Sequence, residues 1–317
     1  MHRLPRLTAL VAVLAFILAA CSSAGASTAP SADATTAPAT TAPSEATEPS
    51  EAPEASVDPE SLLGKILAAG KIRISTDPNY APFSSVKTDG TYEGFDTATA
   101  EETVKRMSEK LGTTIELQWE TPGWDLITAG SWGGRWDLSI GSMSVTETRA
   151  KVVDFVDPYY YDAGGVAVPE ASTVTSLEEL NGGKTFCVGT ATTYEQWLNG
   201  TLEIVDPAKL DPPTDPVVTG LPTDNECIQA VAAGRTFDAI VANKNGLEAA
   251  IANDQPIKMV SAPIFTVSVS FAMDKSGPDT AAMLDLLNEI VAEMHADGTL
   301  KALSEQWLGE DATTKPS

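Results

Sequence analysis

The chain has 317 residues, of which 43% are hydrophobic, so it is long enough to bury a large core in more than one lobe. Its 44 acidic residues outnumber its 20 basic residues and give a formal net charge of −24. This excess of negative charge argues against binding to nucleic acid or to an anionic membrane surface.

The first 59 residues are predicted to be a targeting segment followed by a tether. Residues 1–20 join a basic start to a short apolar run, which is typical of an export signal and too short for a stable transmembrane helix. The "LAAC" that ends this run resembles a bacterial lipobox, so Cys21 is the expected lipidated N-terminus; an ordinary secretory signal is the alternative. Residues 21–59 are almost entirely Ala, Ser, Thr, Pro and Glu, a composition that predicts a disordered tether.

From residue 60 onward, strand patterns alternate with helix patterns, and the alternation restarts after residue 165. This rhythm predicts an α/β fold with two lobes and mainly parallel sheets. Lobe one is expected at 60–165 together with 266–310, lobe two at 166–265, and a tail at 311–317. The expected strands are 70–77, 114–119, 135–145, 157–170, 184–190, 237–243 and 265–277, and the expected helices are 96–112, one from 125, 176–182, 192–200, 226–235, 279–295 and 300–308.

The cysteines and histidines restrict the chemistry. Cys187 and Cys227 remain after the signal, and an even count in an exported domain favours a disulfide, with two separate buried thiols as the alternative. His295 is the one histidine outside the signal, and its pattern is that of a solvated helix residue. A single histidine removes most zinc sites and every Ser-His or Cys-His mechanism, so we expect no metal and no cofactor.

Polar and aromatic side chains follow several predicted strands, where ligands of open parallel sheets bind. Ser142 and Ser144 lie at a spacing of two and therefore point to one face of an extended segment. Arg149 follows them and carries a planar fork that can hold a carboxylate bidentately, although a surface ion pair is the alternative. The candidate ligand-binding residues are Asp77, Tyr80, Phe83, Trp124, Ser142, Ser144, Arg149, Thr192, Thr193 and Asn243.

Each of these candidates also has a structural interpretation. Thr192 and Glu195 match a capping box at the start of a helix, and the amides exposed there can also bind an anion. The aromatic candidates are as typical of a core as of a pocket wall. Asp77 can receive an ammonium group or merely cap the turn at Pro78.

Several longer segments resemble one protein family. "IRISTDPNYAPF", "GFDTATAEE", "WDLSIGSMSVTETRAKVVDFVDPYY" and "LNEIVAEMHADGTLKALSEQWLG" are similar to the extracellular solute-binding proteins of family 3. These are two-lobed receptors of polar amino-acid ABC importers, such as the histidine- and the lysine/arginine/ornithine-binding proteins. The resemblance covers nearly everything from Gly64 to Gly309 and implies a periplasmic-binding-protein type II (Venus flytrap) fold.

The resemblance also implies roles for individual residues. It places Asp77 and Tyr80 in the pocket for the ligand's side chain, with Trp124 near its wall. It gives contacts with the ligand's main-chain groups to Ser142, Ser144 and Thr193, and the α-carboxylate to Arg149. Many members of the family carry an aspartate for the α-ammonium where this chain has Asn243, and Asp77 and Asp224 are the candidates to compensate.

We therefore expect a lipid-anchored, extracytoplasmic, monomeric receptor that passes a small amino-acid-like ligand to an ABC permease in the membrane. One alternative is an enzyme like cyclohexadienyl dehydratase on the same fold, for which Glu195 and Asp77 are the candidate acids. Others are a binding protein for opines or other carboxylates, and a sensor domain that feeds a kinase or a channel.

Overall fold

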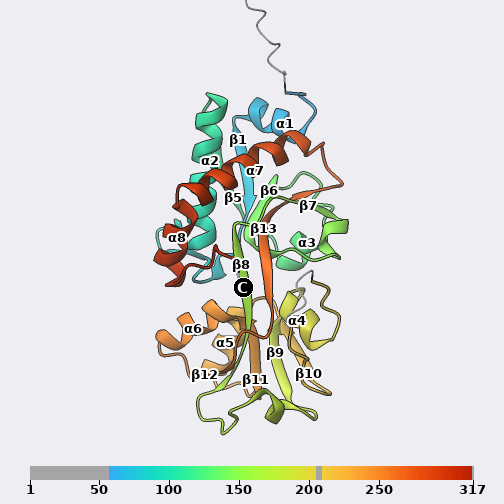
Figure 1. The fold of residues 1–317 in the computed structure, drawn as a ribbon, viewed down its shortest axis with the longest axis vertical. Coiled ribbons are helices and arrows are strands. Elements are labelled where there is room, and N and C mark those ends of the chain that lie inside the picture. The colour runs from blue at the N-terminus through green and yellow to red at the C-terminus, as the bar shows by residue number, and fades with distance from the viewer. Residues whose placement is uncertain (1–56, 205–208, 316–317) are drawn as a thin grey trace, which may run out of the picture. The chain divides into compact units, whose positions relative to one another are not determined.

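The computed structural model describes residues 57–204 and 209–315 (Figure 1). The predicted signal peptide, Cys21 and all but the last residues of the predicted tether lie outside this range. The helices are α1 (Leu62–Ala69), α2 (Phe95–Leu111), α3 (Trp124–Thr128), α4 (Thr193–Leu198), α5 (Asp224–Ala232), α6 (Lys244–Ala252), α7 (Ala281–Ala296) and α8 (Thr299–Leu308), with 3₁₀ turns η1 (Arg149–Lys151) and η2 (Leu177–Leu180). The strands are β1 (Lys71–Ser75), β2 (Asn79–Tyr80), β3 (Ser84–Val86), β4 (Tyr92–Glu93), β5 (Glu116–Glu120), β6 (Leu138–Ser144), β7 (Val153–Phe155), β8 (Tyr160–Pro169), β9 (Thr185–Gly189), β10 (Val217–Leu221), β11 (Ala239–Asn243), β12 (Ile257–Ser261) and β13 (Thr266–Asp274).

Ten of the strands form one mixed sheet whose main path runs β10-β9-β11-β8-β13-β6-β1-β5. The strands joined by helical crossovers pair in parallel, as β1 does with β5 and β6, and as β9 does with β10 and β11. The expected alternation of strands and helices is thus present. The sheet is mixed rather than mainly parallel because the long strands β8 and β13 pair antiparallel with their neighbours.

Strands β8 and β13 connect two halves of the sheet, each with its own core (Figure 1). Residues Tyr160–Ala163 of β8 pair with β13, whereas from Gly164 onward β8 pairs with β11. Large apolar clusters lie on either side of this change of partner: one packs around β1, β6, α2 and α7, and two pack around β9, β11 and α4 or α5. We call the half with β1 and β6 the first lobe and the half with β9 and β11 the second lobe.

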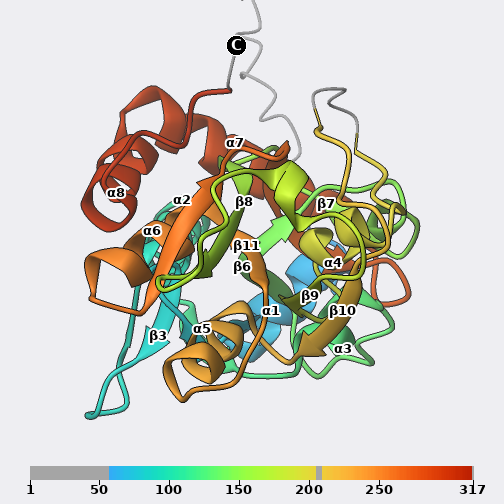
Figure 2. The same cartoon turned by 90° about the horizontal axis from the view of Figure 1, so that it is seen from below.

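In the second lobe, helices cover both faces of the strands. Figure 2 shows α5 and α6 on one side of β9 and β11, and α4 on the other. A disulfide between Cys187 in β9 and Cys227 in α5 links one of these helices to the sheet. The link fixes the position of α5 beside the carboxyl end of β9.

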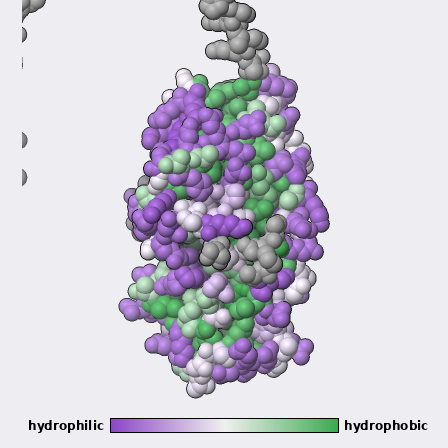
Figure 3. Space-filling view, viewed as in Figure 1, coloured by the Kyte–Doolittle hydropathy of each residue, from purple (hydrophilic) through white to green (hydrophobic). Residues whose placement is uncertain are grey.

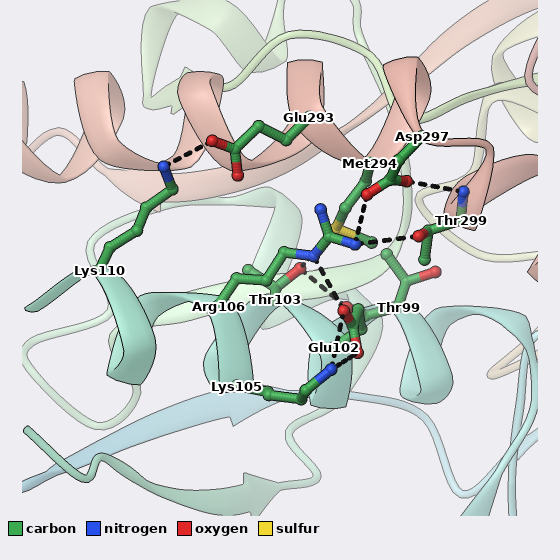
Figure 4. Close-up of polar contacts among 10 residues, drawn as sticks. All are labelled: Thr99, Glu102, Thr103, Lys105, Arg106, Lys110, Glu293, Met294, Asp297 and Thr299. Carbon is green, nitrogen blue, oxygen red and sulfur yellow. Dashed lines mark hydrogen bonds and ion pairs between the residues drawn. The ribbon is translucent and has the colours of Figure 1, made fainter. Parts of the chain in front are cut away.

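In the first lobe, α2 packs along α7 through an apolar face and is bordered by ion pairs (Figure 4). Lys110 Nζ lies 2.6 Å from Glu293 Oε1, and Arg106 Nη2 lies 2.8 Å from Asp297 Oδ2. Surface pairs of this kind contribute only about 0–1 kcal/mol each, so the buried face supplies most of the stability. The outer surface of these helices is accordingly hydrophilic in Figure 3.

The structure adds several short elements that the sequence pattern did not predict. These are the helices α1 and α6, the 3₁₀ turn η1, the three-stranded sheet β2-β3-β4, and strands β7, β10 and β12. The helix expected at 176–182 is reduced to the 3₁₀ turn η2. The expected tail also makes a contact, because the Tyr161 amide of β8 donates a hydrogen bond to Ala312 O (2.8 Å).

Candidate ligand-binding site

A pocket opens between the two lobes, where strands of both end. Its first-lobe side comes from the segment after β1, from α3, and from the end of β6 with η1. Its second-lobe side comes from the start of α4 and the start of α5. The lining residues are Asp77, Tyr80, Trp124, Gly141, Ser142, Ser144, Arg149, Thr192, Thr193, Tyr194, Pro222, Thr223 and Asp224.

The end of β6 supplies two serines to this pocket. Ser142 Oγ donates to Asp96 Oδ2 (2.7 Å) and accepts from the Tyr160 hydroxyl (2.8 Å). Its φ of 55° lies in the left-handed region, which is uncommon for a residue other than glycine. Ser144 Oγ lies 3.4 Å from Thr193 Oγ1 of the second lobe. The β6 serines therefore sit at the junction of the lobes.

Arg149, at the start of η1, projects its guanidinium across this junction. The residue is only 3% exposed, and its Nη1 and Nη2 donate to Ser144 O (3.0 Å) and Ala191 O (3.0 Å). Its Cζ lies 5.3 Å from the ring centroid of Trp124. Burial lowers the pKa of Arg149 to about 10, which leaves the group cationic at neutral pH.

This guanidinium has no acidic partner in the described part of the chain. Arg149 is in none of the ion pairs there, and its Nε is buried without a hydrogen-bond acceptor. Only two of its five N–H groups are engaged, so a bidentate contact with a carboxylate is still available. The alternative of a surface ion pair is therefore wrong.

The start of α4 forms the facing wall. Thr192 is its N-cap and accepts a hydrogen bond from the Glu195 amide (3.1 Å), so the predicted cap is confirmed. The Glu195 carboxylate accepts from the Ala191 amide (2.7 Å) and is thereby engaged in holding this turn. The Ala191 carbonyl receives hydrogen bonds from two first-lobe side chains, Arg149 and Trp124, the latter at 3.2 Å.

Two carboxylates line the pocket. Asp77 Oδ1 accepts from the Asn79 amide (2.7 Å), and partial burial raises the pKa of Asp77. Asp224, in the first turn of α5, is 4% exposed, and its Oδ1 accepts from the Gly189 amide (2.9 Å). Burial raises the pKa of Asp224 to about 7, with smaller increases from the charges of Asp162 and Asp77.

Two predicted ligand-binding residues do not reach the pocket lining. Phe83 is fully buried and stacks on Tyr80, with ring centroids 5.2 Å apart, so it supports the lining from behind. Asn243 is 1% exposed and caps α6 through Oδ1, which accepts from the Gly246 amide (2.9 Å). Its Nδ2 donates to Asp162. The prediction that these two side chains line the site is therefore corrected, whereas the other eight candidates do lie in the lining.

The comparisons with known proteins fit this geometry. The family of bacterial extracellular solute-binding proteins, family 3, matches residues 72–310. The chain belongs to this family. The match confirms the family resemblance and the two-lobed α/β fold read from the sequence.

Individual relatives bind amino acids. The L-cystine-binding protein of Escherichia coli K12 is 29% identical over 258 residues, which are 80% of this chain and 88% of the relative. The histidine-binding periplasmic protein of the same strain is 27% identical over 247 residues, 76% of this chain and 88% of its own. A crystal structure of an ancestral amino acid-binding protein, a precursor of cyclohexadienyl dehydratase, has a TM-score of 0.65 and 27% identity, with coverage of 78% of this chain and all of that chain.

Membership in this family makes the protein a solute receptor of the extracytoplasmic type linked to amino-acid ABC transport, and the relatives named above are binding proteins. Within residues 57–204 and 209–315, the helices are all too short or too polar to cross a bilayer.

Proposed function

We propose that the pocket holds a small amino-acid-like ligand whose carboxylate is bound by Arg149. A buried cation without an anionic partner is destabilising, because the desolvation of the charge is not compensated. The guanidinium of Arg149 is in this state, and it lines an otherwise accessible pocket beside Ser142 and Ser144. A bound carboxylate would supply the missing charge and the hydrogen-bond acceptors.

The ligand would also favour the closed arrangement of the lobes. Arg149 and Ser144 belong to the first lobe, and Thr193 and the α4 amides to the second. Only closure makes both sets of contacts at once, so binding shifts the population toward the closed form. We propose that the first lobe comprises 60–165 with 266–310, that the second comprises 166–265, and that an ABC permease receives the ligand from the closed protein.

The experiment is a thermal-shift panel on residues 57–317 with L-cystine, L-histidine, L-arginine and small dicarboxylates. Saturation at a hundredfold excess over Kd stabilises the folded state by about 2.7 kcal/mol, which gives a clear shift in Tm. Arg149→Met removes the charge but keeps most of the volume, and it should abolish the shift for every ligand that the wild type binds. The unliganded Tm should change little, because the loss of the two hydrogen bonds to Ser144 O and Ala191 O is offset by the removal of a buried, unpaired charge.

A matched control is Arg235→Ala, which removes an exposed arginine of the second lobe remote from the pocket lining. This variant should respond to ligands as the wild type does. A full ligand response in Arg149→Met, with Arg235→Ala also normal, would show that the carboxylate is held elsewhere.

We further propose that the mature protein is a monomer anchored through a lipid on Cys21. The "LAAC" sequence and the tether composition support this placement. Expressed in a bacterial host, the full chain should partition into the detergent phase of Triton X-114, and Cys21→Ser should move it to the aqueous phase. Equal partitioning of the two chains would contradict the anchor.

A further inference from the structure

Asn243 is not available for a cationic group of a ligand. Its amide nitrogen donates to Asp162, and its carbonyl oxygen caps α6 by accepting from the Gly246 amide. Both ends of the side chain are thus committed to neighbours, and the residue is absent from the pocket lining. The ligand's amino group, if it has one, must be received by another residue.

The carboxylate of Asp224 lies beside this position. The backbone amide of Asn243 is close enough to favour the ionised form of Asp224, as is the amide of Gly189, to which Oδ1 is hydrogen-bonded. Asp224 therefore sits against the carboxyl end of β11, although it comes from the first turn of α5. The disulfide from α5 to β9 holds this turn in place.

One oxygen of this carboxylate is unsatisfied. Oδ2 of Asp224 is buried and has no hydrogen-bond donor in the described part of the chain, while the residue itself is 96% buried and lines the pocket. No Lys or Arg forms an ion pair with it there. A buried carboxylate in this state is stabilised most by a donor that is itself positively charged.

The other acids near the pocket are less suited to this role. Asp96 accepts from Ser142 and Tyr159, and Asp162 accepts from Tyr194 and Asn243. Neither is in the lining. Among the lining residues, Asp224 is the one buried acid, and it faces the same cavity as the unpaired guanidinium of Arg149.

We infer that Asp224 binds the ammonium group of the ligand, so that the pocket selects a zwitterion with Arg149 at one charge and Asp224 at the other. This inference rests on the proposed function. It adds that a free amino group is required, which favours α-amino acids over dicarboxylates and over acids that lack the amino group.

The test compares amino acids with their desamino analogues by isothermal titration calorimetry. The pairs are L-arginine with 5-guanidinopentanoate and L-histidine with 3-(imidazol-4-yl)propanoate. The wild type should bind at least one amino acid 10- to 100-fold more tightly than its analogue, as expected for a buried charge-assisted contact. Asp224→Asn should lose this preference, because it should weaken the binding of the amino acid. The Kd of the analogue should stay within about threefold of its wild-type value, which is less than the 10-fold change that 1.4 kcal/mol represents.

The matched control is Glu226→Gln, which removes one negative charge from the same helix outside the pocket lining. It should keep the wild-type preference. A preference that survives intact in Asp224→Asn would overturn the inference while leaving the proposed function standing. If the wild type binds none of the amino acids or dicarboxylates, the proposed function fails and the inference fails with it.

A second measurement needs no variant. Asp224 carries a raised pKa in the empty protein, so binding of an ammonium group beside it at pH 7 should release protons. Titrations of the best-bound amino acid in phosphate and in Tris, which differ in ionisation enthalpy, should then give different apparent enthalpies. Equal enthalpies in the two buffers would contradict the contact even if Asp224→Asn proves unstable.

Discussion

The ends of β6 and β11 occupy comparable places in the two lobes, yet the polar side chains there have different roles. Beyond β6, Arg149 keeps donors free and faces the pocket, although it also hydrogen-bonds two carbonyls. At the end of β11, both ends of the Asn243 side chain are already hydrogen-bonded: Oδ1 caps α6, and Nδ2 donates to Asp162. A polar residue at a strand's end is therefore available to a ligand only if the adjacent helix does not need it first.

The largest expected effect on stability comes from replacing Asn243, whose side chain is assigned a structural role. Asn243→Ala would leave the Gly246 amide without its cap and remove a donor from the buried Asp162 carboxylate. Two lost buried hydrogen bonds of this kind should reduce the free energy of unfolding by about 2–4 kcal/mol. Urea unfolding measures this, with Asn253→Ala as control, because Asn253 follows α6 and is exposed. A loss below 1 kcal/mol would mean that Asn243 is not a structural residue.

The stability of the unliganded protein should also depend on pH. Burial raises the pKa of Asp96 and Asp224 to about 7 and that of Asp162 to about 6, so the folded state binds more protons than the unfolded state above pH 4. The free energy of unfolding should therefore fall steadily as pH rises from 5 to 7. Chemical denaturation at pH 5, 6 and 7 without ligand measures the slope.

The slope of unfolding free energy against pH also distinguishes Asp224, beside the end of β11, from Arg149, beyond the end of β6. Asp224→Asn should reduce it, because one of the titrating groups is removed, whereas Arg149→Met should preserve its sign, since Arg149 titrates near pH 10. Stability that stays level between pH 5 and 7 in the unliganded wild type would show that these carboxyls are already ionised in the folded protein.

Much of the first-lobe wall was predictable from the sequence. Ser142, Ser144 and Arg149 belong to a continuous segment in which the spacing of hydroxyl groups fixes one face of a strand. The cap at Thr192 was predictable for the same reason, because a capping box is a local pattern. The fold class followed from the alternation of strands and helices, which depends on short-range periodicity.

The parts that were missed or left open depend on contacts between distant segments. Phe83 and Tyr80 are both aromatic and three residues apart, and the sequence does not say which of the two stacks behind the other. The sequence named Asp224 only as one of two candidates to compensate for Asn243, because Asp224 follows β10, a five-residue strand whose residues are mostly half-buried or exposed and carry little apolar signal. Only the packing of α5 against β9 shows that this acid lies beside the end of β11.

The two strands that connect the lobes also constrain how the lobes can move. Because β8 and β13 are hydrogen-bonded to each other at the crossing, from Tyr160–Val269 to Ala163–Thr266, they form a two-stranded ribbon instead of two independent linkers. A two-stranded ribbon can bend perpendicular to its plane while the backbone hydrogen bonds between its strands stay intact. Sliding of one strand along the other would break those hydrogen bonds. The lobes are thus expected to swing about a single axis, so Thr193 returns to the same register opposite Ser144 in every cycle.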